Sequence, residues 1–74
     1  MILISYVKPY IIIRSDKVIS GRLFIVGNSK KVLWTDEFLH KDFLSVKIKK
    51  DWKEKIEVIV EADNVKCKKI FQFG

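Results

Sequence analysis

The sequence predicts an all-β domain, and three features of its 74 residues lead to that prediction. Eleven Ile and eight Val stand against a single Ala, Ala62, and β-branched side chains lose rotamer freedom in helices but pack well on pleated sheets. Apolar and polar residues alternate over several stretches, most clearly residues 55–62, as half-buried strands require. Turn signals recur about every 8–12 residues, a spacing typical of β-sandwiches and β-barrels. We count about seven short strands in one domain, residues 1–74.

Residues 55–62 and 65–73 are expected to form the hairpin around which the domain is built. Val58 lies on the predicted core face of the first strand. Asp63-Asn64 suits a two-residue turn, because short polar side chains tolerate the left-handed backbone. That turn predicts the register: Glu61 faces Lys66, a cross-strand ion pair contributing about 0.2–1 kcal/mol. Lys69 falls among inward-facing residues, so we expect either a bulge or a strand at a sheet edge.

The N-terminal half predicts more short strands with turns between them. Two short strands are predicted at residues 2–7 and 10–14. Lys8-Pro9 separates them, because proline has no N–H to donate to a neighbouring strand. Ser15-Asp16-Lys17 is predicted to be a turn, followed by a strand at 18–26 in which Gly21 marks a bulge or a close backbone approach. Residues 31–35 should pair back across the loop 27–30, with Val26 opposite Lys31. In that register four side chains face the core: Leu23, Ile25, Val32 and Trp34.

The third quarter of the chain combines a crossover with a further strand. Residues 35–42 are predicted to cross over, with one helical turn at 36–40. Leu44, Val46 and Ile48 alternate with polar residues, which predicts an amphipathic strand. The loop at 50–53 carries Trp52, which we expect to close one end of the core.

The order of these elements resembles that of a known class of small domains. Residues 20–23, 43–48 and 56–62, with the loop at 50–53 and the turn Asp63-Asn64, follow a strand-and-turn rhythm that resembles small immunoglobulin-like or transthyretin-like modules of bacterial and archaeal proteins. The resemblance implies an immunoglobulin-like antiparallel β-sandwich of about seven short strands. A small five- to six-stranded β-barrel is the alternative. The Cys…Trp…Cys signature of antibody domains is absent, since the chain has one cysteine, Cys67, and the resemblance supplies no ligand residue.

No pattern in the sequence predicts catalysis, a metal site or a cofactor. Asp36, Glu37, His40 and Asp42 form the richest polar cluster, but their spacing matches no metal or acid–base motif. His40 is the only histidine, and Cys67 sits in a predicted strand, so a nucleophile with a neighbouring base is not expected. The single cysteine, and the lack of a signal peptide or a membrane-spanning apolar run, favour an intracellular location.

Two binding functions compete. The first is a non-catalytic protein-interaction or assembly module, whose partner is another protein or a second copy of the chain in a dimer. Its candidate patch is the set of apolar residues predicted on outer sheet faces: Phe24, Leu33, Ile59 and Ile70. The alternative is nucleic-acid binding by a basic β-protein, for which the net charge of +6 is suited. Its candidate face is Lys47, Lys49, Lys50, Trp52, Lys53 and Lys55.

Overall fold

The computed structural model describes residues 1–52 and 54–73, with Glu54 described by its backbone. It confirms the all-β prediction: five antiparallel strands form one sheet, and a short 3₁₀ turn, η1 (Asn28–Lys30), follows the second strand. The strands are β1 (Ile2–Val7), β2 (Tyr10–Val26), β3 (Val32–Lys47), β4 (Glu54–Ala62) and β5 (Val65–Phe73).

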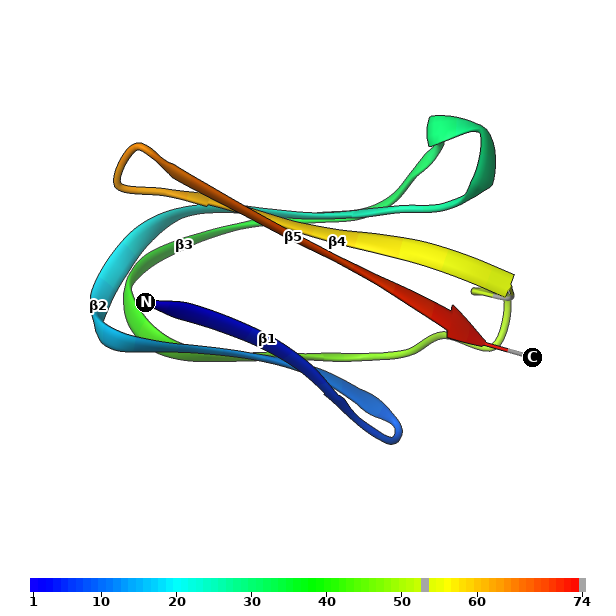
Figure 1. Cartoon of the computed structure of the whole chain (residues 1–74), viewed down its shortest axis with the longest axis horizontal. Coiled ribbons are helices and arrows are strands. Elements are labelled where there is room, and N and C mark those ends of the chain that lie inside the picture. The colour runs from blue at the N-terminus through cyan, green and yellow to red at the C-terminus, as the bar shows by residue number, and fades with distance from the viewer. Residues whose placement is uncertain (53, 74) are drawn as a thin grey trace.

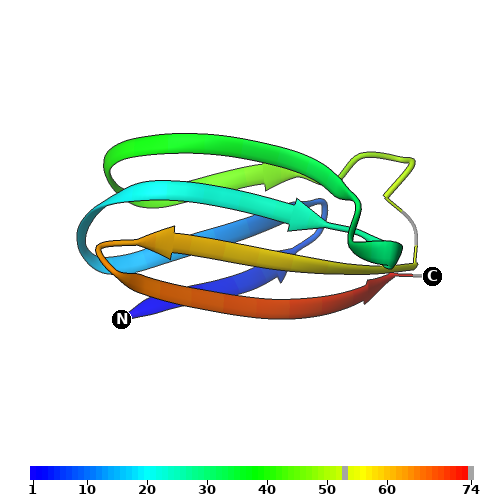
Figure 2. The ribbon, with the colours of Figure 1, turned by 90° about the horizontal axis from the view of Figure 1, so that it is seen from above.

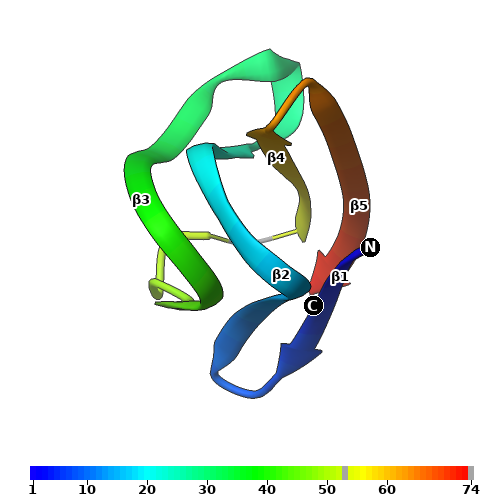
Figure 3. The ribbon, with the colours of Figure 1, turned by 90° about the vertical axis from the view of Figure 1, so that its left-hand side faces the viewer.

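β2 and β3 are long and bent, and their bend curls the sheet so that its two halves face each other (Figures 1 and 3). Before the bend, residues 10–14 of β2 lie between β1 and residues 43–47 of β3, which makes a three-stranded half. After the bend, residues 21–26 of β2 lie between the first part of β3 and β4, and β5 adds the edge of a four-stranded half. The two strands bend together, because the register between them shifts at residues 14–21.

The core fills the space between the two halves. Alternate side chains of both halves point inward, and the fully buried ones are all aliphatic: Ile11, Ile13, Leu23, Ile25, Ile56, Val58 and Val60. Trp52 closes the core at one end with 4% of its surface exposed, which confirms its predicted role as a lid. No polar residue is buried in the described part of the chain, so the core is held by apolar packing alone.

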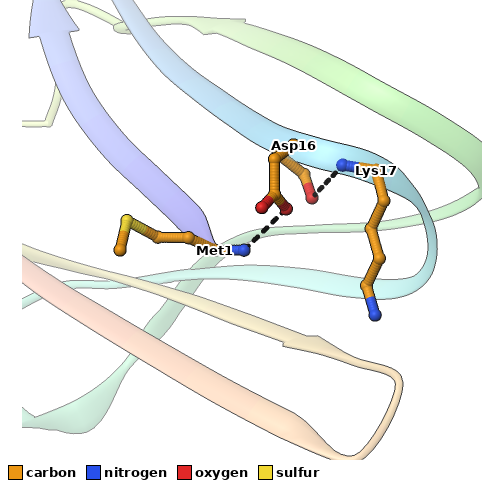
Figure 4. A network of polar contacts seen from close by, with 4 residues as sticks. Met1, Asp16 and Lys17 are labelled. Atoms are coloured by element: carbon orange, nitrogen blue, oxygen red, sulfur yellow. Dashed lines mark hydrogen bonds and ion pairs between the residues drawn. The ribbon is translucent and has the colours of Figure 1, made fainter.

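The predicted turn at Ser15-Asp16-Lys17 is wrong, because the chain stays extended through the bend. Polar contacts hold the segment there (Figure 4). The Met1 ammonium lies 2.6 Å from Asp16 Oδ1, and the Lys17 amide donates to Ser15 Oγ at 3.3 Å. The Asp16 amide also donates to the Met1 carbonyl. These contacts satisfy backbone groups that a tight turn would have satisfied internally.

The predicted crossover with a helical turn at 36–40 is also wrong, since these residues belong to β3. β3 bends where His40 takes a positive φ of 53°, and the His40 amide donates to Ser20 Oγ at 3.0 Å. Two pairs of predicted short strands therefore merge through the bend. Seven expected strands become five, and the strands at 10–14 and 18–26 are the clearest case.

The closing hairpin has the predicted register, with Glu61 opposite Lys66. The register of β2 with β3 differs from the prediction. Ile25 pairs with Trp34, and Val26 pairs with Val32 rather than Lys31. The reason is the loop: Ser29 and Lys30 both take positive φ, and the Gly27 amide donates to the Lys31 carbonyl at 2.8 Å.

This longer loop is followed by a bulge, which exchanges the orientation of two side chains. Val32, predicted in the core, is 54% exposed, whereas Leu33 packs against the core. Gly21 makes the expected close approach, since an added Cβ would lie 2.0 Å from the Glu61 carbonyl oxygen. Lys69 needs no bulge, because β5 is an edge strand and the Lys69 ammonium lies 5.7 Å from the centre of the Phe71 ring.

Candidate interaction surfaces

The outer side of the three-stranded half carries four of the exposed large apolar side chains of the described chain: Leu3, Val7, Tyr10 and Phe43. The strand registers arrange its nine side chains in three rows. Side chains next to them in sequence, such as Ile11 and Ile13, point into the core, so these nine point outward. None of the nine is acidic, and we call this surface the acid-free face. From the bend toward the loops, its rows are Leu3, Arg14, Phe43; Ser5, Ile12, Ser45; and Val7, Tyr10, Lys47.

The exposure and charge of the acid-free face both favour a binding role. Val7 is 62% and Phe43 49% exposed, and Leu3 and Tyr10 are also exposed. One of its two cations lies over an aromatic ring, and the other is on the residue paired with Tyr10. The Arg14 guanidinium carbon is 5.6 Å from the Phe43 ring centre, and Lys47 pairs directly with Tyr10. Soluble monomers rarely expose contiguous apolar patches of this kind without a use for them.

The apolar patch predicted from the sequence lies on the opposite side, on the outer face of the four-stranded half. Phe24 and Ile59 are directly opposite each other on β2 and β4, and Ile70, 53% exposed, lies one strand further on β5. Leu33 does not join them, because Thr35 takes the place opposite Phe24 and Leu33 packs inward. Three of the four predicted residues therefore share this face.

Charged residues surround that patch and are paired with one another. The Arg22 Nε lies 3.4 Å from Glu37, and the Lys66 Nζ lies 3.5 Å from Glu61. These exposed pairs contribute little stability, but they form one charged row across four strands beside Phe24 and Ile59. The apolar patch on the outer face of the four-stranded half therefore lies beside paired charges, whereas the acid-free face carries no carboxylate.

The residues of the predicted lysine face separate into two groups. Lys47, Lys49, Lys50 and Lys55 are exposed and lie toward the end of the molecule that holds three of the four connections between strands (Figures 1 and 2). We call this region the loop end. Trp52 is buried and presents no ring to a ligand, and Lys53 lies outside the described residues.

The other connections bring further lysines to the loop end. The Ile48 amide donates to the Pro9 carbonyl at 2.7 Å, which places the turn containing Lys8 beside the loop after β3. Lys30 and Lys55 line one groove under η1. The exposed lysines of the loop end are therefore Lys8, Lys30, Lys31, Lys47, Lys49, Lys50 and Lys55.

A cleft of about 320 Å³ opens beside these lysines, between the two arms of the bent β3. Trp34 and Asp36 line it from one arm, and residues 45–49 line it from the other. The Lys49 ammonium lies 4.7 Å from the centre of the Trp34 ring, and Trp52 meets the same ring edge-on at 6.4 Å. The Trp34 indole N–H is buried and has no hydrogen-bond partner among the described residues.

Sequence reasoning missed the role of Trp34 in this cleft. It assigned Trp34 to the core, and Trp34 does pack against the core, directly opposite Ile25. It did not predict the cleft, from which the partly buried Trp34 is also accessible. The one available signal was its place near the start of a strand that follows a lysine pair, and that signal is weak.

The acidic residues around His40 do not converge. Asp36, Glu37, His40 and Asp42 are all exposed on β3, where Asp36 Oδ1 accepts the Glu37 amide at 2.9 Å and Glu37 contacts Arg22. Within residues 1–52 and 54–73, no three His, Cys, Asp or Glu side chains are placed to hold a metal ion. Elsewhere, the Met1 ammonium hydrogen-bonds and attracts the Asp16 carboxylate, which lowers the pKa of Asp16.

Comparisons of this chain with protein-family models, with curated proteins and with solved structures give no match. Among the described residues, no helix is long and apolar enough to cross a membrane. The candidate surfaces are therefore judged on their own geometry: the acid-free face, the charged outer face of the four-stranded half, and the basic loop end with its cleft.

Proposed function

We propose that the chain is a non-catalytic protein-interaction module that assembles through the acid-free face, with a second copy of itself as the partner. The observation that carries this proposal is the three-row surface: five apolar side chains, two serines and two cations, with no carboxylate. Burying a surface of this composition against another apolar surface is favourable, because apolar area is removed from water. It also leaves no carboxylate buried without a partner.

The arrangement of the rows suits packing of one sheet face against another. Ile12 is at the centre between Ser5 and Ser45, whose small side chains leave room for a partner's larger ones. Arg14 and Lys47 lie in the outer rows, so their charged ends can reach water at the rim. Two such faces can pack at the ~10 Å spacing that is usual for stacked sheets.

For the architecture of the subunit we propose an immunoglobulin-like sandwich, with a small barrel as the alternative. The sandwich is supported by the two facing halves of the sheet with an apolar core between them. The barrel is supported by the edge strands β1 and β5, which meet through the Tyr6 and Phe73 rings at 4.8 Å. Hydrogen exchange distinguishes them: amides of β1 that face β5 exchange quickly at a sandwich edge and slowly in a closed barrel.

Sedimentation equilibrium with two matched variants tests the assembly. Val7→Lys places a charge on the acid-free face, and Ile70→Lys places one at a comparably exposed position on the other outer face. Val7 still exposes 62% of its surface, and burying a whole Val side chain contributes about 1.5–3 kcal/mol. Losing the burial free energy of Val7 in both copies should weaken the dimer at least tenfold, which corresponds to roughly 1.4 kcal/mol or more.

The wild type is expected to show a concentration-dependent dimer that Val7→Lys weakens and Ile70→Lys does not. A wild type that stays monomeric up to millimolar concentration overturns self-assembly through this face. Equal weakening by both variants also overturns it, because the effect would then follow net charge rather than position.

A further inference from the structure

The loop end adjoins the acid-free face proposed for assembly and shares Lys47 with it. It gathers seven exposed lysines, while three described carboxylates lie with them: Asp36 in the cleft, and Asp51 and Glu57 on the loops and strand ends. At the opposite end, around the bend and the β4–β5 turn, Asp16, Asp42 and Asp63 lie among the basic residues. The charge of the molecule is therefore concentrated at the loop end.

The seven lysines belong to segments that are far apart in the sequence but reach the same end of the molecule (Figure 2), where they form smaller groups. Lys30 and Lys55 share a groove, Lys47 and Lys49 share the Trp34 cleft, and the Ile48–Pro9 hydrogen bond draws the turn with Lys8 alongside. The lysines of such a cluster repel one another, and their interaction with a row of negative charges is favourable. A polyanion supplies that line of charges.

The cleft adds an aromatic surface beside the lysines. The Lys49 ammonium lies over the Trp34 ring, 4.7 Å from its centre, while the indole also packs against the core and meets Trp52 edge-on. The cleft also carries acceptors and donors, since Asp36 and Ser45 line it with Trp34. The buried Trp34 N–H, which has no partner in the described chain, can donate to a ligand acceptor.

We propose that the loop end binds single-stranded nucleic acid, with phosphates on its lysines and one base in the cleft against Trp34. The base takes the place of the Lys49 ammonium on the ring, and Lys49 turns to a phosphate. Stacking of a base on an aromatic ring is the usual partner of backbone charge contacts in single-strand binding. Asp36 can accept a hydrogen bond from an N–H of the base, which in thymine is the ring N3–H.

The composition of the cluster also predicts the mode of recognition. Its cations are all lysines, whereas Arg14 and Arg22 lie on other surfaces. Arginine is the usual reader of base edges, and lysine contacts phosphate as a point charge. Binding is therefore expected to be largely independent of sequence and strongly dependent on salt. Duplexes should bind less well, because their stacked bases cannot enter the cleft.

A fluorescence titration tests the proposal with three probes: a twelve-residue thymidine oligonucleotide, a duplex of equal length, and heparin, a polyanion without bases. If five to seven lysines contact phosphates, affinity for the single strand should fall roughly 10²–10³-fold between 50 and 200 mM salt. Only the single strand should quench tryptophan emission, and Trp34→Phe should abolish that quenching. The proposal is overturned by an absence of binding at 50 mM salt, or by heparin and duplex quenching as strongly as the single strand.

Charge-matched variants separate a site from a general effect of positive charge. Lys49→Glu and Lys50→Glu change the loop end, and Lys50→Glu does so without touching the Trp34 ring. Lys68→Glu makes the same change on the exposed edge strand β5. Both loop-end variants should weaken binding at least tenfold more than Lys68→Glu. Equal losses in all three variants would contradict the proposal and leave only non-specific attraction by net charge.

Discussion

Two Val→Asp substitutions should have opposite outcomes. Val58 is fully buried on β4 between the two halves of the sheet. Val32 is at the start of β3 and is 54% exposed. Sequence patterning places both in the core, so the pair tests the bulge and the β2–β3 register directly. We expect Val58→Asp to unfold the domain and Val32→Asp to leave it folded.

The magnitudes follow from burial. A 74-residue domain has a total stability of roughly 4–11 kcal/mol at the usual 0.05–0.15 kcal/mol per residue. Val58→Asp loses about 1.5–3 kcal/mol of side-chain burial and adds an unpaired carboxylate that costs several kcal/mol more. Those losses approach or exceed the total. At Val32 the new carboxylate meets water, so the loss should stay below about 1 kcal/mol, or a few degrees in Tm.

Thermal and urea unfolding followed by circular dichroism measure both effects. Burial raises the pKa of a carboxyl group at position 58 in the folded state above its unfolded value. The folded state then binds more protons, so the stability that Val58→Asp retains is present at low pH and lost as pH rises. The gap to wild type should therefore narrow from pH 7 to pH 4. A Val58→Asp melt within two degrees of wild type, or unfolding by Val32→Asp, would refute this assignment of the buried face.

Three further predictions concern single contacts. Gly21→Ala should cost about 1–3 kcal/mol or more, measured by urea unfolding, because its Cβ would collide with the Glu61 carbonyl 2.0 Å away; an unchanged urea midpoint would contradict this close approach. Glu61→Ala should cost less than about 1 kcal/mol despite removing the ion pair with Lys66, since both side chains are about half exposed; a larger loss would show a coupling not visible in the contacts. The pKa of the Asp16 carboxyl, measured by NMR titration, should lie below its ordinary value of 3.8. Its small stabilisation of the fold is therefore present above pH 3.8 and is lost as the pH falls through the folded-state pKa. A titration midpoint at or above 3.8 would exclude the N-terminal ion pair in solution.

The closing hairpin was predictable because all its determinants are local. The alternation of Ile56, Val58 and Val60 identifies the buried face, and the two-residue turn fixes the register. Asp63 and Asn64 take the positive φ values of 49° and 64° that this turn needs. The lid role of Trp52 followed from an aromatic residue in a polar loop at the end of a strand.

The bend in β2 and β3 was not predictable from the same signals. Polar residues at 15–17 and 35–42 resemble turn and crossover sequences, yet their backbone groups are satisfied by neighbouring strands and by contacts such as His40 to Ser20. Ser29, Lys30 and His40 adopt positive φ without being glycine, so composition gave no warning of the longer loop or the bulge. Tertiary pairing decided these segments rather than local preference.

The candidate surfaces divide in the same way. The lysines near residue 50 could be grouped by sequence because they lie on one strand end and one loop. The acid-free face could not, because it depends on which side of β1 meets the core. β1 pairs with residues 10–14 of β2 in the three-stranded half and leaves its own outer residues, Leu3 and Val7, exposed.

The central claim is that assembly uses the acid-free face, and isoleucine methyl NMR over a range of protein concentrations tests it most directly. Ile12 and Ile59 are matched probes, since each is partly buried on the outer face of one half of the sheet. We predict that the Ile12 methyl signals shift and broaden as concentration rises from micromolar to millimolar, while those of Ile59 stay unchanged. Concentration-dependent changes at Ile59 with none at Ile12 would contradict the claim, as would spectra that do not change at either residue.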